Sequence, residues 1–398
     1  MIAGKSTIEY KNKCSGCSAC VNSCPLGIVF MKEDTEGFLY PHISDVEKCN
    51  HCGVCEHVCH YADSSVIPTT PKNVIACKCK DNDIREESSS GGIFSVLAEL
   101  ALSDGGVVFG ASFDENCVLI HSFEEDEDYK KFRTSKYVQS DLRNVFVETK
   151  TALDNGRKVL FTGTPCQITG LKSFLQKDYE NLFCVDFICH GVPSPKMLRM
   201  HLDELSQNVD GEIVNIRFRT KKGLWKKCTT TTITTITGHV FSIKRDSFML
   251  GFLQNLYLRP SCHNCNVNNH RSKADISIGD YWGCETKYRK FDDERGVSLI
   301  LIRSDKGINT FASIEHKMDF MEIELDHPLI FNPNIVRSTR PNKNRDVFFK
   351  LIDEGLPFSE CVKKFTVTHI ELVREVLSPG QVRWIQLILS KLKKTKRI

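Results

Sequence analysis

The sequence predicts a mixed α/β (α+β) protein, in which a small cysteine-rich module precedes a larger domain with a mixed sheet and a helical C-terminal tail. Three observations predict this fold class. The pattern C-x2-C-x2-C-x3-C occurs twice before residue 60, Pro68 and Pro71 interrupt the chain behind it, and strand-like apolar runs then alternate with amphipathic helices. The length of 398 residues suits several domains, and we expect them at 1–66, 73–160, 161–335 and 336–398.

The doubled cysteine pattern is typical of two 4Fe-4S clusters. Three thiolates two residues apart hold three corners of one cubane, and the fourth reaches the neighbouring cluster. The expected ligands of the first cluster are Cys14, Cys17, Cys20 and Cys59. Those of the second are Cys49, Cys52, Cys55 and Cys24. Zinc sites or disulfides are the alternatives, although structural zinc prefers separated cysteine pairs.

The two cysteine runs differ in the residue that follows them. Pro25 follows the first run, as in bacterial-type ferredoxins, whereas His60 follows the second. We expect this change to affect the local turn and not the number of ligands.

Composition limits the classes of function. Nineteen cysteines in a long chain without an apolar leader argue for a reducing, cytoplasmic location and not for a disulfide scaffold. No apolar run approaches the ~18 residues of a transmembrane helix. A net charge of +3, from 53 basic and 50 acidic residues, argues against a nucleic-acid partner.

The C-terminal end is the one strongly biased segment. An apolar stretch around Trp384 is followed by a basic end, with Lys391, Lys393, Lys394, Lys396 and Arg397. This tail is a candidate for peripheral contact with an anionic membrane or an acidic partner. The alternative is a frayed terminal helix with a solvated basic end.

The larger domain shows regular alternation of secondary structure. Strand-like and helical runs alternate over 73–79, 93–102, 105–113, 145–156, 157–164, 168–176 and 181–189. Period-2 β-formers on both sides of Thr237-Gly238 predict a hairpin. The chain from about residue 345 is expected to be mostly helical.

A glycine- and serine-rich turn stands directly before the predicted helix at 93–102. Ser90, Gly91 and Gly92 would leave backbone N–H groups open for the pyrophosphate of a dinucleotide such as FAD. An ordinary N-cap and turn is the alternative. No GxGxxG follows a strand, so a Rossmann NAD site is not indicated. Lys136 and Tyr137, near Arg133, are candidates to pair with phosphate or reduced flavin, or form only a basic surface turn.

Four further cysteines follow the ends of strand-like runs or form a close pair. They are Cys166, Cys189, Cys262 and Cys265. Together they make a full set of four ligands for one cluster. A zinc half-site at the C-x2-C pair, with the other two as buried or nucleophilic thiols, stays an alternative on spacing alone.

Several motifs in order resemble the beta subunit family of coenzyme F420 hydrogenases and dehydrogenases, to which plant hydroxymethyl chlorophyll a reductase also belongs. These motifs are SSSGGIFSVLAEL, SKYVQSD, VLFTGTPCQITGLK, FICHGVPSPK, SCHNC and ADISIGDYWG, spanning about residues 73–335. The resemblance implies a flavin domain with FAD and a third 4Fe-4S cluster on Cys166, Cys189, Cys262 and Cys265. It therefore argues against a zinc site at these cysteines. It also implies flavin contacts at Ser90, Gly91, Gly92, Lys136 and Tyr137. Further flavin contacts are implied in the loop from Asp275 to Gly279, at Asp275, Ser277 and Gly279.

The expected function is an FAD-dependent iron–sulfur oxidoreductase. Electrons from ferredoxin or a partner subunit would pass the clusters to FAD, which exchanges hydride with a small organic acceptor, and the direction can be reversed. His190, beside Cys189, is a candidate proton donor, or a histidine that only caps the turn. A non-catalytic electron-transfer adaptor of a larger redox complex is the alternative function.

Overall fold

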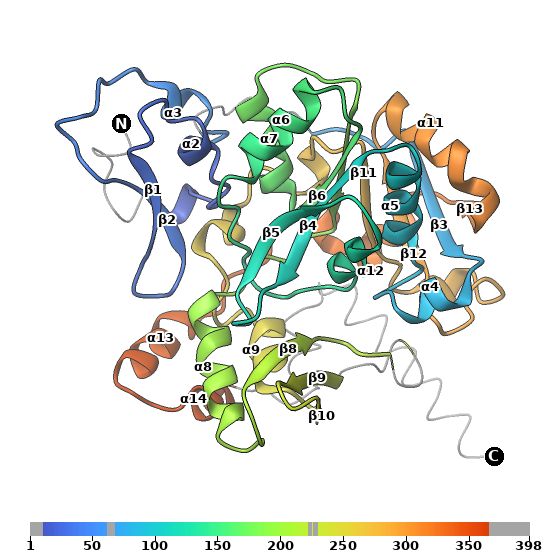
Figure 1. Ribbon diagram of the computed structural model, residues 1–398. Helices are drawn as coiled ribbons and strands as arrows, with labels where there is room; N and C mark the ends of the chain where they lie inside the picture. Colours follow the sequence, from blue (N-terminus) through green and yellow to red (C-terminus); the bar gives the residue numbers. More distant parts are fainter. Residues whose placement is uncertain (1–10, 62–67, 222–224, 226–229, 366–398) are drawn as a thin grey trace, which may run out of the picture.

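The computed structural model describes residues 11–61, 68–221, 225 and 230–365. Figure 1 shows three parts: the cysteine-rich module in blue, a large sheet between layers of helices, and a smaller sheet with its own helices below. The mixed α/β fold class is therefore confirmed. The basic end at 391–397 and residues 62–67, directly before Pro68, lie outside the described residues.

The cysteine-rich module is built on one hairpin and two short helices. Strands β1 (Val29–Glu33) and β2 (Leu39–Ile43) pair antiparallel. Helices α2 (Ala19–Asn22) and α3 (Val54–His57) contain or adjoin the cysteine runs. Few apolar residues are buried inside this module, which fits a fold in which bound metal supplies folding energy.

An eight-stranded mixed sheet forms the centre of the molecule, in the order β13-β3-β12-β11-β7-β6-β4-β5. Its strands are β3 (Asn73–Cys79), β4 (Val107–Phe113), β5 (Leu119–Glu124), β6 (Val159–Gly163), β7 (Leu182–Phe187), β11 (Ile276–Asp280), β12 (Ser298–Ile302) and β13 (Met318–Glu322). Strands β4, β6, β7 and β11 are parallel neighbours, and antiparallel strands flank them. The proposed regions 73–160 and 161–335 therefore share one sheet.

Strand direction gathers several loops at one edge of this sheet. Strand β12 is antiparallel to both β11 and β3, so β3 runs in the same direction as the parallel core. The carboxyl ends of β3, β4, β6, β7 and β11 consequently meet at the same edge. In open α/β sheets, ligands bind at this edge.

Helices cover both faces of the large sheet. Helices α5 (Ile93–Ser103) and α11 (Asp305–Ile314) pack on one face, where Val108 and Leu160 point. Helices α6 (Val145–Asp154) and α7 (Pro165–Leu175) pack on the other face with Phe109 and Phe161. Ala19 and Val58 of the cysteine-rich module join this second core, so the module docks on the α6–α7 side (Figure 1).

The smaller sheet has a separate core. Its strands are β8 (Ile213–Arg217), β9 (Thr230–Thr235) and β10 (Val240–Lys244). The antiparallel pair β9–β10 confirms the predicted hairpin. Helices packed on it are α8 (Pro195–Ser206), α9 (Ser247–Leu253), α13 (Arg345–Asp353) and α14 (Phe358–Phe365). The described part of the 336–398 tail thus folds back into this core.

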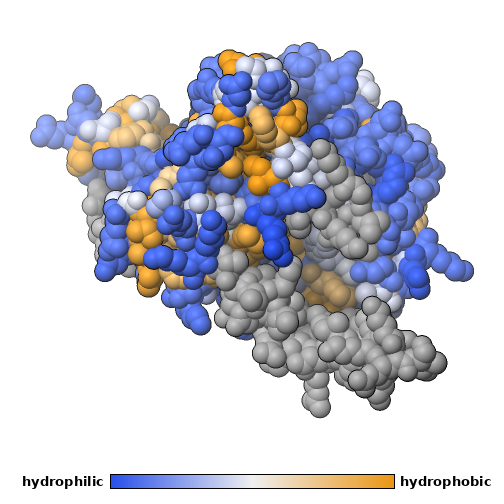
Figure 2. Space-filling view, turned by 90° about the horizontal axis from the view of Figure 1, so that it is seen from below, coloured by the Kyte–Doolittle hydropathy of each residue, from blue (hydrophilic) through white to orange (hydrophobic). Residues whose placement is uncertain are grey.

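Short helices complete the chain. These are α4 (Asn82–Glu86), η1 (Glu127–Phe132), η3 (Pro260–Asn264), η4 (Asn269–Arg271), α10 (Cys284–Lys287), η5 (Glu315–Lys317), α12 (Asp326–Phe331) and η6 (Pro333–Ile335). Among the described helices, none has the length and apolar character needed to cross a bilayer. Seen from below, the surface is mostly hydrophilic, with hydrophobic residues in separate patches (Figure 2).

Candidate iron–sulfur and flavin site

The structure brings the first four predicted ligands together. Cys20 interacts electrostatically with Cys17, Cys14 and Cys59. Burial raises the pKa of Cys17 to about 12, and its neighbours Cys14 and Cys59 contribute to the rise. Four sulfurs this close repel one another as thiolates, so they require bound cations to be deprotonated together.

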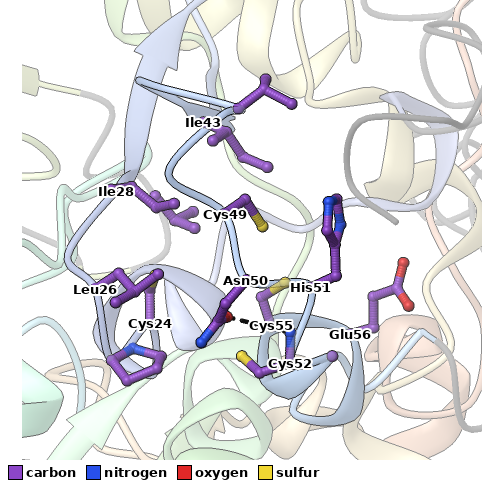
Figure 3. A pocket seen from close by; sticks show the side chains of 14 residues that line it. Cys24, Leu26, Ile28, Ile43, Cys49, Asn50, His51, Cys52, Cys55 and Glu56 are labelled. Atoms are coloured by element: carbon purple, nitrogen blue, oxygen red, sulfur yellow. Dashed lines mark hydrogen bonds between the residues drawn. The ribbon is translucent and has the colours of Figure 1, made fainter.

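The second group surrounds a small cavity. Cys24, Cys49, Cys52 and Cys55 line a space of about 90 Å³, and Figure 3 shows them around it with Leu26, Ile28 and Ile43. This volume is far below the ~300 Å³ at which pockets for organic ligands begin, and it suits a compact inorganic group. Cys55 interacts with Cys24, Cys52 and Cys49. Both groups therefore show the interleaved arrangement that the spacing predicts.

Cys24 is favoured as a thiolate by its surroundings. Burial acts to raise its pKa, but nearby backbone N–H groups, led by those of Ile28 and Leu26, outweigh it and lower the pKa below the ordinary value. Amide hydrogen bonds to sulfur are one means by which proteins tune cluster potentials.

The third group lies at the carboxyl edge of the sheet. Cys166 stands in the first turn of α7, which follows β6 and begins with a Thr164–Gln167 capping box. Cys189 follows β7, and Cys262 and Cys265 lie within and directly after η3. Cys189 interacts with Cys262, Cys166 and Cys265, and its pKa is raised, first by burial and then by these thiols.

Glycines permit the close approach of these loops. A Cβ on Gly191 would lie 3.2 Å from Cys262 Cβ, so the loop after β7 packs tightly on η3. A Cβ on Gly170, one turn after Cys166 in α7, would lie 2.9 Å from Cys17 Sγ. Cys17 also interacts electrostatically with Cys166. The first and third groups therefore adjoin each other.

His60 takes the place of the proline that would end the second run. Its buried imidazole has Nδ1 3.8 Å from Cys17 Sγ and Nε2 3.4 Å from Ser15 Oγ. Burial lowers the pKa of His60 to about 4, so the ring is neutral at pH 7. The change in sequence thus places a hydrogen-bonding group on a predicted ligand sulfur, in addition to any effect on the turn.

His190 has a polar partner at one ring nitrogen. Its Nε2 lies 2.7 Å from Asn255 Oδ1, and its ring packs edge-on against Phe252. Burial lowers its pKa, although hydrogen bonds with Asn255 and Asn334 oppose the change. The lowered pKa favours a neutral ring beside Cys189, and a role in proton donation stays a prediction.

The serine–glycine turn follows β3 at the same edge and leads into α5. Its Gly91 amide already donates to Ser298 Oγ at 2.9 Å, and Ser90 Oγ donates to Val297 O. Gly92 has φ of 92°, and no side chain caps the first turn of α5. The open part of the predicted cradle is therefore the start of α5 and not the Gly91 amide.

The Lys136 segment is tied to this turn. Ser135 N donates to Ser89 Oγ at 2.8 Å. The Lys136 ammonium donates to three backbone carbonyls, those of Lys131, Arg133 and Thr134. Burial, followed by the charge of Arg217, lowers the pKa of Lys136 to about 7.

Tyr137 connects this segment to the third thiol group. It packs against Phe252, the ring that also contacts His190. Its hydroxyl accepts a hydrogen bond from Arg219 at 3.1 Å. The predicted flavin contacts Lys136 and Tyr137 therefore lie on a continuous path toward Cys189.

The three residues expected around β11 are separated by the strand. Gly279, near the carboxyl end, packs against Ile188, which precedes Cys189. Asp275 lies before the strand, where its carboxylate accepts from Cys184 N and Ser304 Oγ. Ser277, fully buried in mid-strand, accepts from Arg303 Nε. Only Gly279 of the three stands at the edge of the third group.

A group of charged and aromatic side chains at the end of β11 was not predicted. Arg219 forms an ion pair with Asp280 at 2.6 Å and lies over both Trp225 and Trp282. The two indoles stack at 4.7 Å, and Trp225 Nε1 donates to Ser89 O. The tryptophan in GDYWG was a usable signal, but Arg219 and Trp225 belong to no motif in the sequence.

Comparisons with known proteins agree with this architecture. Residues 156–326 match the C-terminal part of the coenzyme F420 hydrogenase/dehydrogenase beta subunit, and residues 13–62 match a 4Fe-4S dicluster domain. The C-terminal part of the chain therefore matches a domain of this family of oxidoreductase subunits, and its N-terminal part matches a domain for two 4Fe-4S clusters. The family match contains all four thiols of the third group, whereas the serine–glycine turn and Lys136 precede it.

Two relatives and one solved structure are similar to this chain. One subunit of the F(420)H(2) dehydrogenase of Methanosarcina mazei is 23% identical over 329 residues, 78% of this chain and 84% of the relative. An uncharacterised protein of Methanocaldococcus jannaschii is 26% identical over 207 residues, 45% of this chain and 57% of that protein. A chain of the F420-reducing NiFe hydrogenase complex from Methanosarcina barkeri superposes with a TM-score of 0.46 at 19% identity, covering 78% of this chain and 94% of that one.

Proposed function

We propose that the chain is an iron–sulfur flavoprotein subunit that carries electrons between a redox partner and FAD, with hydride exchange at a small organic acceptor. The partner is a ferredoxin or another subunit of a redox complex, as the name of the Methanosarcina mazei relative suggests. One observation carries the proposal. The three thiol groups form an unbroken series, linked by Cys55 near Cys20 and by Cys17 near Cys166.

The residues fit the groups they are proposed to hold. Each thiol group has four sulfurs, the ligand number of a 4Fe-4S cluster. The third group lies at the same edge of the sheet as the uncapped start of α5, to which the Lys136 segment is tied. A helix start and a lysine suit the pyrophosphate of FAD. When bound, clusters pass single electrons and a flavin converts them into pairs.

Residues around the proposed flavin position supply orientation and water exclusion. Tyr137, Phe252 and the imidazole of His190 form a packed aromatic wall. Asn255 orients the His190 ring through Nε2. In this role the neutral ring would first take up a proton from solvent and then donate it, as imidazolium, to a reduced acceptor.

The third cluster is tested by Cys262→Ser in the full-length protein purified without oxygen. We expect a loss of about four irons with the other two clusters intact, because those have eight thiolates of their own. Iron, acid-labile sulfide and EPR of the reduced protein measure this. The matched control is Cys117→Ser, a buried thiol that donates to Ile213 O in a separate core. Unchanged iron in Cys262→Ser, or zinc in the wild type, would contradict the third cluster.

An adaptor that binds no flavin is the second candidate function. It is favoured by one observation, the use of the Gly91 amide by Ser298 inside the protein. The visible spectrum of the anaerobic protein separates the two functions. Flavin bands beside cluster absorption support the oxidoreductase, and their absence after reconstitution with FAD supports the adaptor.

A further inference from the structure

Arg259 is a fully buried cation at the junction of the cysteine-rich module and the large domain. Its side chain is 0% exposed. Nε donates to Cys14 O at 2.7 Å and Nη2 donates to Leu39 O at 3.0 Å, both in the module. Nη1 donates to Gln139 Oε1 at 2.8 Å, in the large domain. One guanidinium therefore fixes the position of Cys14 relative to the third thiol group.

The charge of Arg259 is not balanced by a carboxylate. Two other buried arginines have acidic partners: Arg85 pairs with Asp293 at 2.7 Å, and Arg345 pairs with Glu36 at 2.5 Å. Among the described residues, no Asp or Glu forms an ion pair with Arg259. Burying an unpaired charge is costly, so an anion is expected beside it.

The available anions are thiolates of two different groups, which are deprotonated when they hold clusters. Nη2 lies 3.7 Å from Cys14 Sγ of the first group. Cys262 of the third group follows Arg259 by three residues, and its amide donates to Arg259 O at 2.9 Å. Cys14 and Cys262 both interact electrostatically with the guanidinium. Arg259 is thus in contact with a thiol of the first group and interacts electrostatically with one of the third.

The surroundings of Arg259 exclude water. Its guanidinium lies over the Tyr40 ring at 4.2 Å and near that of Phe38 at 5.5 Å. Gly16 approaches so closely that a Cβ there would overlap Gln139 and lie 3.0 Å from Arg259 Nη1. In such a dry site, a charge acts more strongly and farther than at the surface.

We propose that Arg259 is the shared counter-charge of the first and third clusters and sets their reduction potentials above that of the second. The proposal rests on the proposed function, because it requires clusters in both groups. A cluster held by four thiolates is an anion that gains negative charge on reduction, and net charge and hydrogen bonds to sulfur set its potential. A nearby fixed cation therefore favours the reduced state of both clusters.

The test is a redox titration of the full-length, cluster-loaded protein followed by EPR. In Arg259→Gln, we expect the equilibrium constant for reduction of the first and third clusters to fall at least tenfold, which is about 59 mV for a one-electron couple. The second cluster should not shift. In Arg259→Lys, which keeps the charge but loses the planar fork, the shift should be smaller.

A second variant keeps the proposal testable if Arg259→Gln does not fold. Gln139→Glu is nearly isosteric and places a carboxylate on Nη1, so it neutralises Arg259 without removing it. We expect the same two potentials to fall. The control is Arg199→Gln, which removes an exposed arginine that pairs with Glu33 of the module at 2.6 Å. This control should leave all three potentials unchanged.

The outcomes separate this inference from the proposed function. Fully loaded Gln139→Glu and Arg259→Gln with unshifted potentials would overturn the role of Arg259 while leaving three clusters in place. Equal shifts in Arg199→Gln would also overturn it, because the effect would then be one of general surface charge. Wild-type protein with only two clusters by iron and EPR would instead remove the proposed function on which the inference rests.

Discussion

Lys136 and Arg259 show how burial treats two cations differently. Arg259 stays charged because guanidinium is a very strong base and thiols face it. Among the described residues, Lys136 donates hydrogen bonds only to backbone carbonyls, and burial together with the charge of Arg217 lowers its pKa to about 7. The first is therefore a fixed charge and the second is a charge that depends on pH.

Flavin affinity should depend on the protonation of Lys136. A bound phosphate favours the ammonium, so FAD affinity should rise as the pH falls through about 7, by at most about tenfold per pH unit. Fluorescence titration of apoprotein with FAD between pH 6 and 9 measures this. Lys136→Met should weaken binding and flatten the pH profile.

The matched control for Lys136 is its neighbour Lys131→Met. Lys131 is exposed and pairs with Glu124. The Lys131→Met variant should bind FAD with the same pH dependence as the wild type. If the FAD affinity of Lys136→Met still depends on pH as in the wild type, another group controls the affinity.

At the scale of elements, the β1–β2 turn docks the cysteine-rich module on α8. Ser194, the N-cap of α8, donates through Oγ to Glu36 O in this turn, and Lys196 Nζ donates to Thr35 O. Gly37 has φ of 87°, and a Cβ there would overlap Lys196. A glycine is thus required both by backbone conformation and by contact.

Gly37→Ala should weaken this docking. We expect a loss of about 1–2 kcal/mol for the left-handed backbone and about 1–3 kcal/mol more for the overlap with α8. Gly27→Ala is the matched control, because Gly27 has φ of 62° in the same module and no atom within 4 Å of its added Cβ. Thermal unfolding of both loaded variants measures the difference. Equal losses of stability in the two variants would show that contact between the turn and α8 does not contribute to stability.

At the scale of the molecule, the three thiol groups run from the surface to the sheet edge. Cys52 of the second group is exposed, whereas the four cysteines of the third group are only partly exposed. The described contacts link the second group to the first and the first to the third. A partner protein would therefore meet the second cluster first.

Removal of the second cluster should slow electron transfer from the partner protein to the flavin. In Cys52→Ser, we expect a loss of about four irons and at least a tenfold slower reduction of the flavin by reduced ferredoxin. Dithionite should still reduce the other clusters, since their thiolates are unchanged. Stopped-flow absorbance and EPR spin counts measure these effects. Wild-type rates in a variant that lacks the second cluster would place the docking site elsewhere.

Local pattern was sufficient for much of this protein. The interleaved cysteines, the β3 and α5 segments, and the β9–β10 hairpin follow from spacing and period over a few residues, because ligand geometry and strand pleat are short-range constraints. The sequence resemblance also pointed to the family whose model matches residues 156–326. Strands β12 and β13 were not predicted, because both pair with β3, more than 200 residues earlier in the sequence, and such pairing leaves no local signal.

Only the tertiary structure decided which residues share the site. Asp275 and Gly279 are four residues apart, but a strand places them at opposite ends of β11, and only Gly279 reaches the edge of the third thiol group. Arg219, Trp225 and Arg259 belong to no motif, yet sheet order and docking of the module bring them beside Ser89, Asp280 and Cys14. The sequence by itself predicted which cysteines of the two N-terminal runs lie together, because their spacing controls that grouping. Folding determined the charges and rings around them, because those contacts join segments that strand pairing and module docking alone bring together.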